Sequence, residues 1–116
     1  MIVCAVDDLL FSIKIKAAAK QLGVELYFER SAEQIVNTVR DKKPSLVIFD
    51  LNSAKLAPLA AITTMKADPE LANVKTLGYV SHVDSTTIEA ARTAGIDQVL
   101  ARSAFATQLG EILTSA

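Results

Sequence analysis

Short strand-like runs alternate regularly with longer helix-forming segments along this sequence. Each strand-like run is short and rich in apolar or β-branched residues, and each is followed by a segment of good helix formers. This order predicts an α/β fold, a doubly wound parallel sheet covered by helices on both faces, with right-handed crossovers. The expected strands are 2–6, 24–30, 45–50, 75–81 and 98–101, and the expected helices are 9–23, 31–42, 57–67, 84–95 and one from Ser103 onward.

Turn and cap residues locate several of these boundaries. Gly23 follows the first helical segment, where glycine commonly ends a helix. Ser31 with Gln34 matches a capping box, so a helix is expected to begin there. Ser103 is a candidate cap for the last helix. The run 24–30 alternates apolar and polar residues, which favours an edge strand with one wetter face.

Length and composition predict a single soluble domain spanning 1–116. The chain is 51% hydrophobic and carries 12 basic and 13 acidic residues, a net charge of −1, so it can bury a core and has no basic excess for nucleic acid. No apolar run approaches the roughly 18 residues that a membrane span needs. A single cysteine, Cys4, cannot form an internal disulfide. These features together predict a cytoplasmic protein that neither enters a membrane nor binds nucleic acid directly.

Polar residues end several of the expected strands. Asp7 and Asp8 follow the first strand, Asp50 ends the third, Ser81 ends the fourth, and Arg102 follows the fifth. In a parallel sheet these ends meet at one edge, where such folds place their ligands. Three neighbouring carboxylates repel one another and suit a hard divalent cation, while a hydroxyl and a guanidinium suit a phosphoryl group. The pattern favours a metal-dependent phosphoryl site, and the alternative is a set of solvated carboxylates that merely end strands.

These motifs resemble the receiver domain of bacterial two-component response regulators, as in the chemotaxis receiver. The matching stretches are VDD (6–8), LVIFD (46–50), the hydroxyl of Ser81 and GIDQVLAR (95–102), and the resemblance covers nearly the whole chain. It implies a flavodoxin-like, CheY-like fold: one five-stranded parallel sheet in the order 2-1-3-4-5 with five helices.

The resemblance also implies a function in a two-component phosphorelay. A receiver accepts a phosphoryl group from a sensor histidine kinase, a phosphotransfer protein or a small phosphodonor, and signals by contact with a downstream protein. It is a phosphoacceptor rather than an enzyme, with at most self-catalysed phosphotransfer and dephosphorylation. The implied acceptor is Asp50. The implied ligands of a weakly bound Mg²⁺ are Asp7 (through water), Asp8, Asp50 and the main-chain carbonyl of Asn52. The implied partners of the phosphoryl oxygens are Ser81 and Arg102.

The chain also departs from the receiver pattern. Arg102-Ser103 stands where receivers have Lys-Pro, His82 follows the strand-four hydroxyl where a small residue is usual, and Val99 replaces a common aromatic residue. Without proline, we expect a trans Arg102–Ser103 bond and a guanidinium that approaches the acidic rim from a different angle or lies partly in solvent. The polar residues usual after the acid pair are replaced by 9–11, of which we expect at least two to pack in the core.

Two other functions remain open at this point. The chain can be a pseudo-receiver, a protein-interaction module that keeps the fold and works without phosphorylation; self-association into a homodimer is also open. A flavodoxin-type binder of small molecules is disfavoured, because a flavin phosphate needs backbone donors after the first strand. The pair Asp7-Asp8 offers two negative charges there instead.

Overall fold

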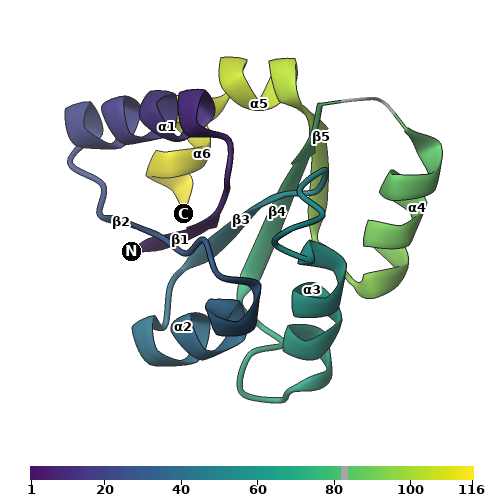
Figure 1. Cartoon of the computed structure of the whole chain (residues 1–116). Coiled ribbons are helices and arrows are strands. Elements are labelled where there is room, and N and C mark those ends of the chain that lie inside the picture. Colours follow the sequence, from purple (N-terminus) through teal and green to yellow (C-terminus); the bar gives the residue numbers. More distant parts are fainter. Residues whose placement is uncertain (82–83) are drawn as a thin grey trace.

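The computed structural model describes residues 1–81 and 84–116, and its strands form one parallel sheet (Figure 1). The strand order is β2-β1-β3-β4-β5, so the predicted doubly wound topology is confirmed. His82, which stands where receivers usually have a small residue, lies outside the described residues. The strands are β1 (Ile2–Ala5), β2 (Leu26–Phe28), β3 (Leu46–Asp50), β4 (Lys75–Val80) and β5 (Gln98–Ala101).

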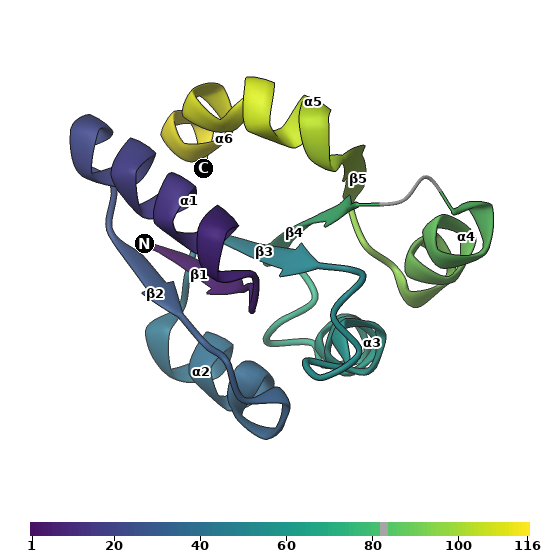
Figure 2. The ribbon, with the colours of Figure 1, turned by 45° about the horizontal axis from the view of Figure 1, so that its top comes forward.

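Helices cover both faces of this sheet. Figure 2 shows α1, α5 and α6 on one side and α2, α3 and α4 on the other. None of the helices in the described part of the chain is long and apolar enough to cross a membrane. Their bounds are α1 (Leu9–Leu22), a 3₁₀ turn η1 (Ala32–Gln34), α2 (Ile35–Lys42), α3 (Pro58–Ala67), α4 (Ser85–Ala94), α5 (Arg102–Thr107) and α6 (Leu109–Ser115).

The core consists of two layers because successive strand residues point to opposite faces of the sheet. Val47 and Phe49 of β3 belong to the layer beneath α2, α3 and α4. Ile48, between them, belongs to the layer beneath α1, α5 and α6, together with Tyr79 of β4. Every residue of β3 is buried, as expected for a central strand covered on both faces. The carboxylate that ends β3 is therefore held by a rigid element.

Three local predictions are wrong. The expected fifth helix is two helices, α5 and α6, because the backbone at Gln108 (φ −94°, ψ 5°) leaves the helical region. Ser103 does not cap α5: Arg102 already begins the helix, which makes Ala101 the N-cap residue. Ser31 makes no capping bond with its side chain, because a 3₁₀ turn precedes the first α-helical residue of α2.

The bond between Arg102 and Ser103 is trans, as expected, since the described residues contain no cis peptide bond. Helix α5 therefore starts directly where β5 ends. This placement puts the side chain of Arg102 at the carboxyl edge of the sheet, beside the ends of β1 and β3.

Substitution of Gly78, a residue of β4, tests the tight packing of this strand against Leu51 and Ile96. A Cβ atom at Gly78 would lie 2.6 Å from Cδ1 of Leu51 and 2.8 Å from Cδ1 of Ile96, both buried. We expect Gly78→Ala to lower the free energy of unfolding by about 1–3 kcal/mol, the usual cost of overpacking. Urea denaturation measures it.

The matched control is Gly110→Ala in α6, where the nearest atom to a new Cβ is 4.0 Å away. It should raise the free energy of unfolding by about 0.5–1 kcal/mol, because alanine loses less backbone entropy than glycine in a helix. Equal effects of the two substitutions would contradict this account of the core.

Candidate functional site

The candidate site is the edge of the sheet where β1, β3, β4 and β5 end. Asp7 and Asp8 follow β1, Asp50 is the last residue of β3, Ser81 follows β4, and Arg102 follows β5. Parallel strands bring these ends to the same edge. The charges of Asp7, Asp8 and Arg102 all act on the pKa of Asp50, so the acidic residues and the guanidinium share one electrostatic environment.

Asp50 is a nearly buried acid at the centre of this edge. Its side chain is only 9% exposed, and Oδ1 accepts a hydrogen bond from the backbone N–H of Asn52 at 3.0 Å. Burial raises the pKa of Asp50, and the negative charges of Asp8 and Asp7 raise it further. The Asn52 bond and the charge of Arg102 act in the opposite direction without cancelling the effect. The ionised carboxylate is therefore costly for the fold, which is a frequent property of functional acids.

Asp8 is the N-cap of α1 and the partner of Arg102. Its Oδ1 accepts a hydrogen bond from the backbone N–H of Phe11 at 3.1 Å, the usual geometry of an aspartate cap. Its Oδ2 lies 2.6 Å from Nη2 of Arg102. Both carboxylate oxygens are therefore occupied by donors from the chain itself.

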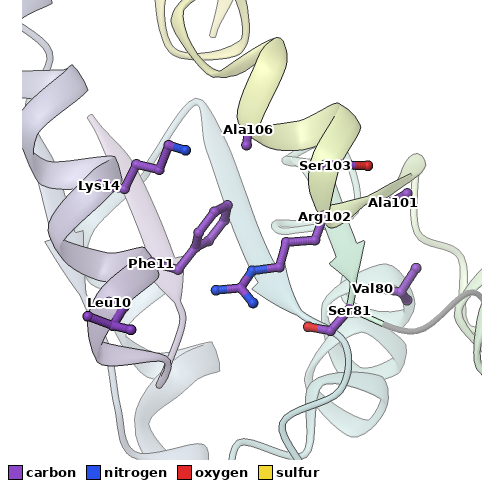
Figure 3. Close-up of a pocket in the computed structure, with 9 residues that line it drawn as sticks. All are labelled: Leu10, Phe11, Lys14, Val80, Ser81, Ala101, Arg102, Ser103 and Ala106. Carbon is purple, nitrogen blue, oxygen red and sulfur yellow. The ribbon is translucent and has the colours of Figure 1, made fainter.

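Arg102 is held by two contacts. Besides the bond to Asp8, its guanidinium carbon lies 4.6 Å from the centre of the Phe11 ring, within cation–π range. Figure 3 shows Arg102 reaching from the start of α5 toward Phe11, with the hydroxyl of Ser81 directed into the same space. The side chain of Arg102 remains 38% exposed. The guanidinium thus reaches the rim and is partly solvated, in line with the orientation expected from the sequence.

An aromatic cluster supports the ring beneath Arg102. The ring centres of Phe11 and Tyr79 are 5.0 Å apart, those of Tyr79 and Phe105 are 5.0 Å apart, and those of Phe11 and Phe105 are 5.5 Å apart. These residues come from α1, β4 and α5, so the cluster ties the two helices to the sheet. The Tyr79 hydroxyl is buried and has no hydrogen-bond partner in the described part of the chain. Burial, followed by the charges of Asp50 and Asp8, raises the pKa of Tyr79.

Two contacts join the loops that follow β1, β3 and β4. Oδ1 of Asn52 accepts a hydrogen bond from the backbone N–H of Ser81 at 2.6 Å. Nζ of Lys55 lies 3.7 Å from Oδ1 of Asp7. The Ser81 residue is exposed, so its hydroxyl is accessible from solvent.

A pocket of about 590 Å³ opens between α1 and α5 beside the rim (Figure 3). Its polar lining comes from Lys14, Ser81, Arg102 and Ser103, and its apolar lining includes Leu10 and Phe11. A guanidinium, an ammonium and hydroxyls around one opening make it suitable for an anionic group.

The side chains at the start of α1 differ from expectation. Phe11 is 5% exposed, whereas Leu9 is 69% and Leu10 78% exposed, so the prediction that at least two of the three pack in the core is wrong. The reason is helical geometry, because only part of a surface helix faces the core. With Ile13, at 56% exposure, they form an apolar surface that we call the α1 patch (Leu9, Leu10 and Ile13).

The acidic residues do not fit a divalent cation as they lie. Their oxygen atoms are the ligands that Mg²⁺ prefers. However, both oxygens of Asp8 are engaged, and Asp7 is paired with Lys55. Among the described residues, no group of three or more His, Cys, Asp or Glu side chains is placed to hold a metal ion. A cation at Oδ2 of Asp8 would lie next to the guanidinium of Arg102 and would be repelled by it.

Two contacts of the site were not predicted from the sequence: Phe11 is the surface on which Arg102 lies, and Lys55 is the partner of Asp7. The spacing of Asp8 and Phe11 indicates that their side chains lie close together, because residues three apart lie on one face at the start of a helix. For Lys55 the loop sequence offers no periodic signal, so only the structure reveals the pair.

Asparagine substitutions of two aspartates should change stability in opposite directions at pH 7. The raised pKa of Asp50 means that its stabilising contribution is present below the ordinary aspartate pKa and is lost as pH rises through the raised value. Asp50→Asn should therefore increase the free energy of unfolding at pH 7, since the amide oxygen can still accept the Asn52 bond.

Asp97 is the matched control. Burial raises its pKa, but hydrogen bonds from Thr76 and Lys66 lower it more, and the net shift is downward. Its contribution is present above the ordinary aspartate pKa and is lost as pH falls through the lowered value. Asp97→Asn should thus destabilise at pH 7. Urea denaturation between about pH 2 and about pH 8 measures both, because this range extends well below the ordinary aspartate pKa of about 3.9; a destabilised Asp50→Asn at pH 7 would contradict the assignment.

Known structures share this architecture. A response regulator from Hahella chejuensis superposes with a TM-score of 0.86 at 13% sequence identity, covering 97% of this chain and 91% of that one. The receiver domain of a Pseudomonas aeruginosa sensor histidine kinase, solved with magnesium in its active-site cleft, gives 0.84 at 18% identity, with 98% and 93% covered. The phosphorylated cyanobacterial phytochrome response regulator RcpA gives 0.81 at 19%, with 98% and 88% covered.

At the level of sequence the chain stands apart. It matches no protein-family model, and no curated protein sequence resembles it significantly. The likeness therefore rests on the three-dimensional arrangement, in which five parallel strands and their helices follow the receiver order from end to end. The chain has the fold of the response-regulator receiver domain.

Proposed function

We propose that this chain is a receiver-type signalling domain in which Asp50 accepts a phosphoryl group. The observation that carries the proposal is the position of Asp50: a nearly buried carboxylate that closes the central strand at the ligand-binding edge of the sheet. Asn52 orients it by bonding Oδ1, and Oδ2 is the nucleophile. The remaining rim charges, from Asp8 and Arg102, set the electrostatics of the reaction.

The transfer step forms one bond and breaks one. Oδ2 of Asp50 attacks the phosphorus of the donor, and the phosphorus–nitrogen bond of a phosphohistidine, or the phosphorus–oxygen bond of acetyl phosphate, breaks as the leaving group takes the electron pair. Arg102 and Ser81, which line the pocket beside the rim, donate hydrogen bonds to the phosphoryl oxygens. The product is an acyl phosphate on Asp50. Hydrolysis of that acyl phosphate returns the carboxylate.

The partners that this reaction needs are proteins. A sensor histidine kinase or a phosphotransfer protein supplies the phosphoryl group, and a downstream protein recognises the changed rim. This exchange would take place in the cytoplasm. The domain itself turns over no external substrate apart from self-catalysed phosphotransfer and dephosphorylation.

A second candidate is a protein-interaction module that does not depend on phosphorylation. Two observations favour it: Arg102 already occupies Asp8 at 2.6 Å, and the α1 patch leaves Leu9, Leu10 and Ile13 exposed beside the rim. A partner that covers these side chains would gain apolar burial without any change at Asp50. The two candidates differ in whether Asp50 is modified.

Chemical phosphorylation distinguishes the two candidates. We expect the protein incubated with acetyl phosphate to gain the mass of one phosphoryl group, mapped to Asp50 by peptide mass spectrometry, because Asp50, of the three carboxylates at this edge, is the one that ends a buried central strand. Asp50→Asn should gain none. Asp41→Asn, which removes an exposed aspartate on α2, should react like the wild type. An unmodified wild-type protein at high donor concentration would overturn phosphoacceptance and support the interaction module.

A further inference from the structure

We infer that Arg102 is a built-in counter-ion that occupies the place of a divalent cation at Asp8. The acidic rim is then neutralised mainly by the chain, and a metal ion binds only in competition with the guanidinium. This inference concerns metal binding alone and holds whether or not Asp50 accepts a phosphoryl group.

Both oxygens of the Asp8 carboxylate already accept a donor from the chain. Oδ1 accepts the N–H of Phe11 and Oδ2 accepts Nη2 of Arg102, so a metal ion at Asp8 would have to share an oxygen with one of these groups. The bond to Phe11 caps α1 and is part of the fold. The bond to Arg102 is charge-assisted and short, at 2.6 Å. A cation that approaches Oδ2 is therefore repelled by a positive group that is already in contact with this oxygen.

Arg102 is also preorganised for this contact. The aromatic cluster of Phe11, Tyr79 and Phe105 fixes the ring on which the guanidinium lies, 4.6 Å from its centre. A planar guanidinium can stack on a ring and donate to a carboxylate at the same time, which an ammonium group does poorly. Two departures from the receiver pattern, Phe11 and Arg102, thus contact each other and act on the same carboxylate.

The charges of the rim also disfavour a divalent cation. Asp7, Asp8 and Asp50 face the positive charges of Arg102 and Lys55, the latter 3.7 Å from Asp7. Only one negative charge is left uncompensated by these pairs. A rim with this balance attracts a doubly charged cation far less than three unpaired carboxylates would, and a guanidinium at Asp8 adds direct repulsion.

The experiment is a metal titration of the intact chain with Mg²⁺ and, separately, with paramagnetic Mn²⁺, followed by amide NMR. The reporters are the amides of Asp7, Asp8 and 50–52. We expect Arg102→Gln to bind at least about fivefold more tightly than the wild type, the factor that corresponds to losing a partly exposed ion pair of about 1 kcal/mol. Removal of the competing charge is the reason for this gain.

Three further variants make the result specific. Arg92→Gln removes the same charge from α4, where Nη1 of Arg92 lies 3.9 Å from the exposed carboxylate of Glu89, and should titrate like the wild type. Arg102→Gln combined with Asp8→Asn should lose the gained affinity, while asparagine still caps α1. Arg102→Lys keeps the charge and should tighten metal binding by a smaller factor than Arg102→Gln does. It therefore provides a second measurement if the Gln variant folds poorly.

The inference is overturned if the wild type and folded Arg102→Gln titrate with the same midpoint, or if Arg92→Gln gains as much as Arg102→Gln. It is also overturned if the double substitution keeps the gained affinity, because the cation would then not depend on Asp8. Phosphorylation of Asp50 does not enter the readout, so the outcome is separate from that of the acetyl phosphate experiment.

Discussion

The ion pair between Arg102 and Asp8 is the interaction on which the candidate site depends. It joins the first residue of α5 to the N-cap of α1, across the carboxyl edge of the sheet. The same guanidinium rests on Phe11, whose ring belongs to the aromatic cluster between the two helices and β4. One side chain therefore links the charge state of the acidic rim to the packing of the layer that holds α1, α5 and α6.

The environment of Asp50 follows from this arrangement. Its carboxylate ends a strand that is buried on both faces, and burial raises its pKa. In a receiver-like site a metal ion would relieve the repulsion between Asp50 and Asp8. In this chain Arg102 supplies the nearby positive charge, and it acts to lower the pKa of Asp50. The site is thus arranged to carry negative charge with a fixed organic cation, which is compatible with a phosphoryl group and unfavourable for a divalent metal.

The sequence predicted the architecture well because the signals for it are periodic. The alternation of strands and helices leads to a parallel sheet, and the residues that end the strands meet at one edge for topological reasons. What it missed depends on single side chains: Gln108 divides the last helix, Ser103 lies inside α5 rather than before it, and Leu10 faces solvent. Topology brings Arg102 to the acidic rim, but no pattern in the chain indicates that its partner is Asp8, 94 residues away, rather than Asp7 or Asp50. Such a pair is decided by tertiary geometry and not by local propensity.

The most direct test of this account is a double-mutant cycle between the two members of the ion pair. The free energy of unfolding would be measured for the wild type, Asp8→Asn, Arg102→Gln and the double variant, at low and high salt. Asparagine at position 8 preserves the helix cap, and both variants that lack the guanidinium lose its contact with Phe11. These effects cancel in the cycle, which therefore isolates the coupling energy between Asp8 and Arg102. The account predicts a stabilising coupling energy of about 0.5–1 kcal/mol that diminishes with salt. A coupling energy of zero at low salt would contradict it.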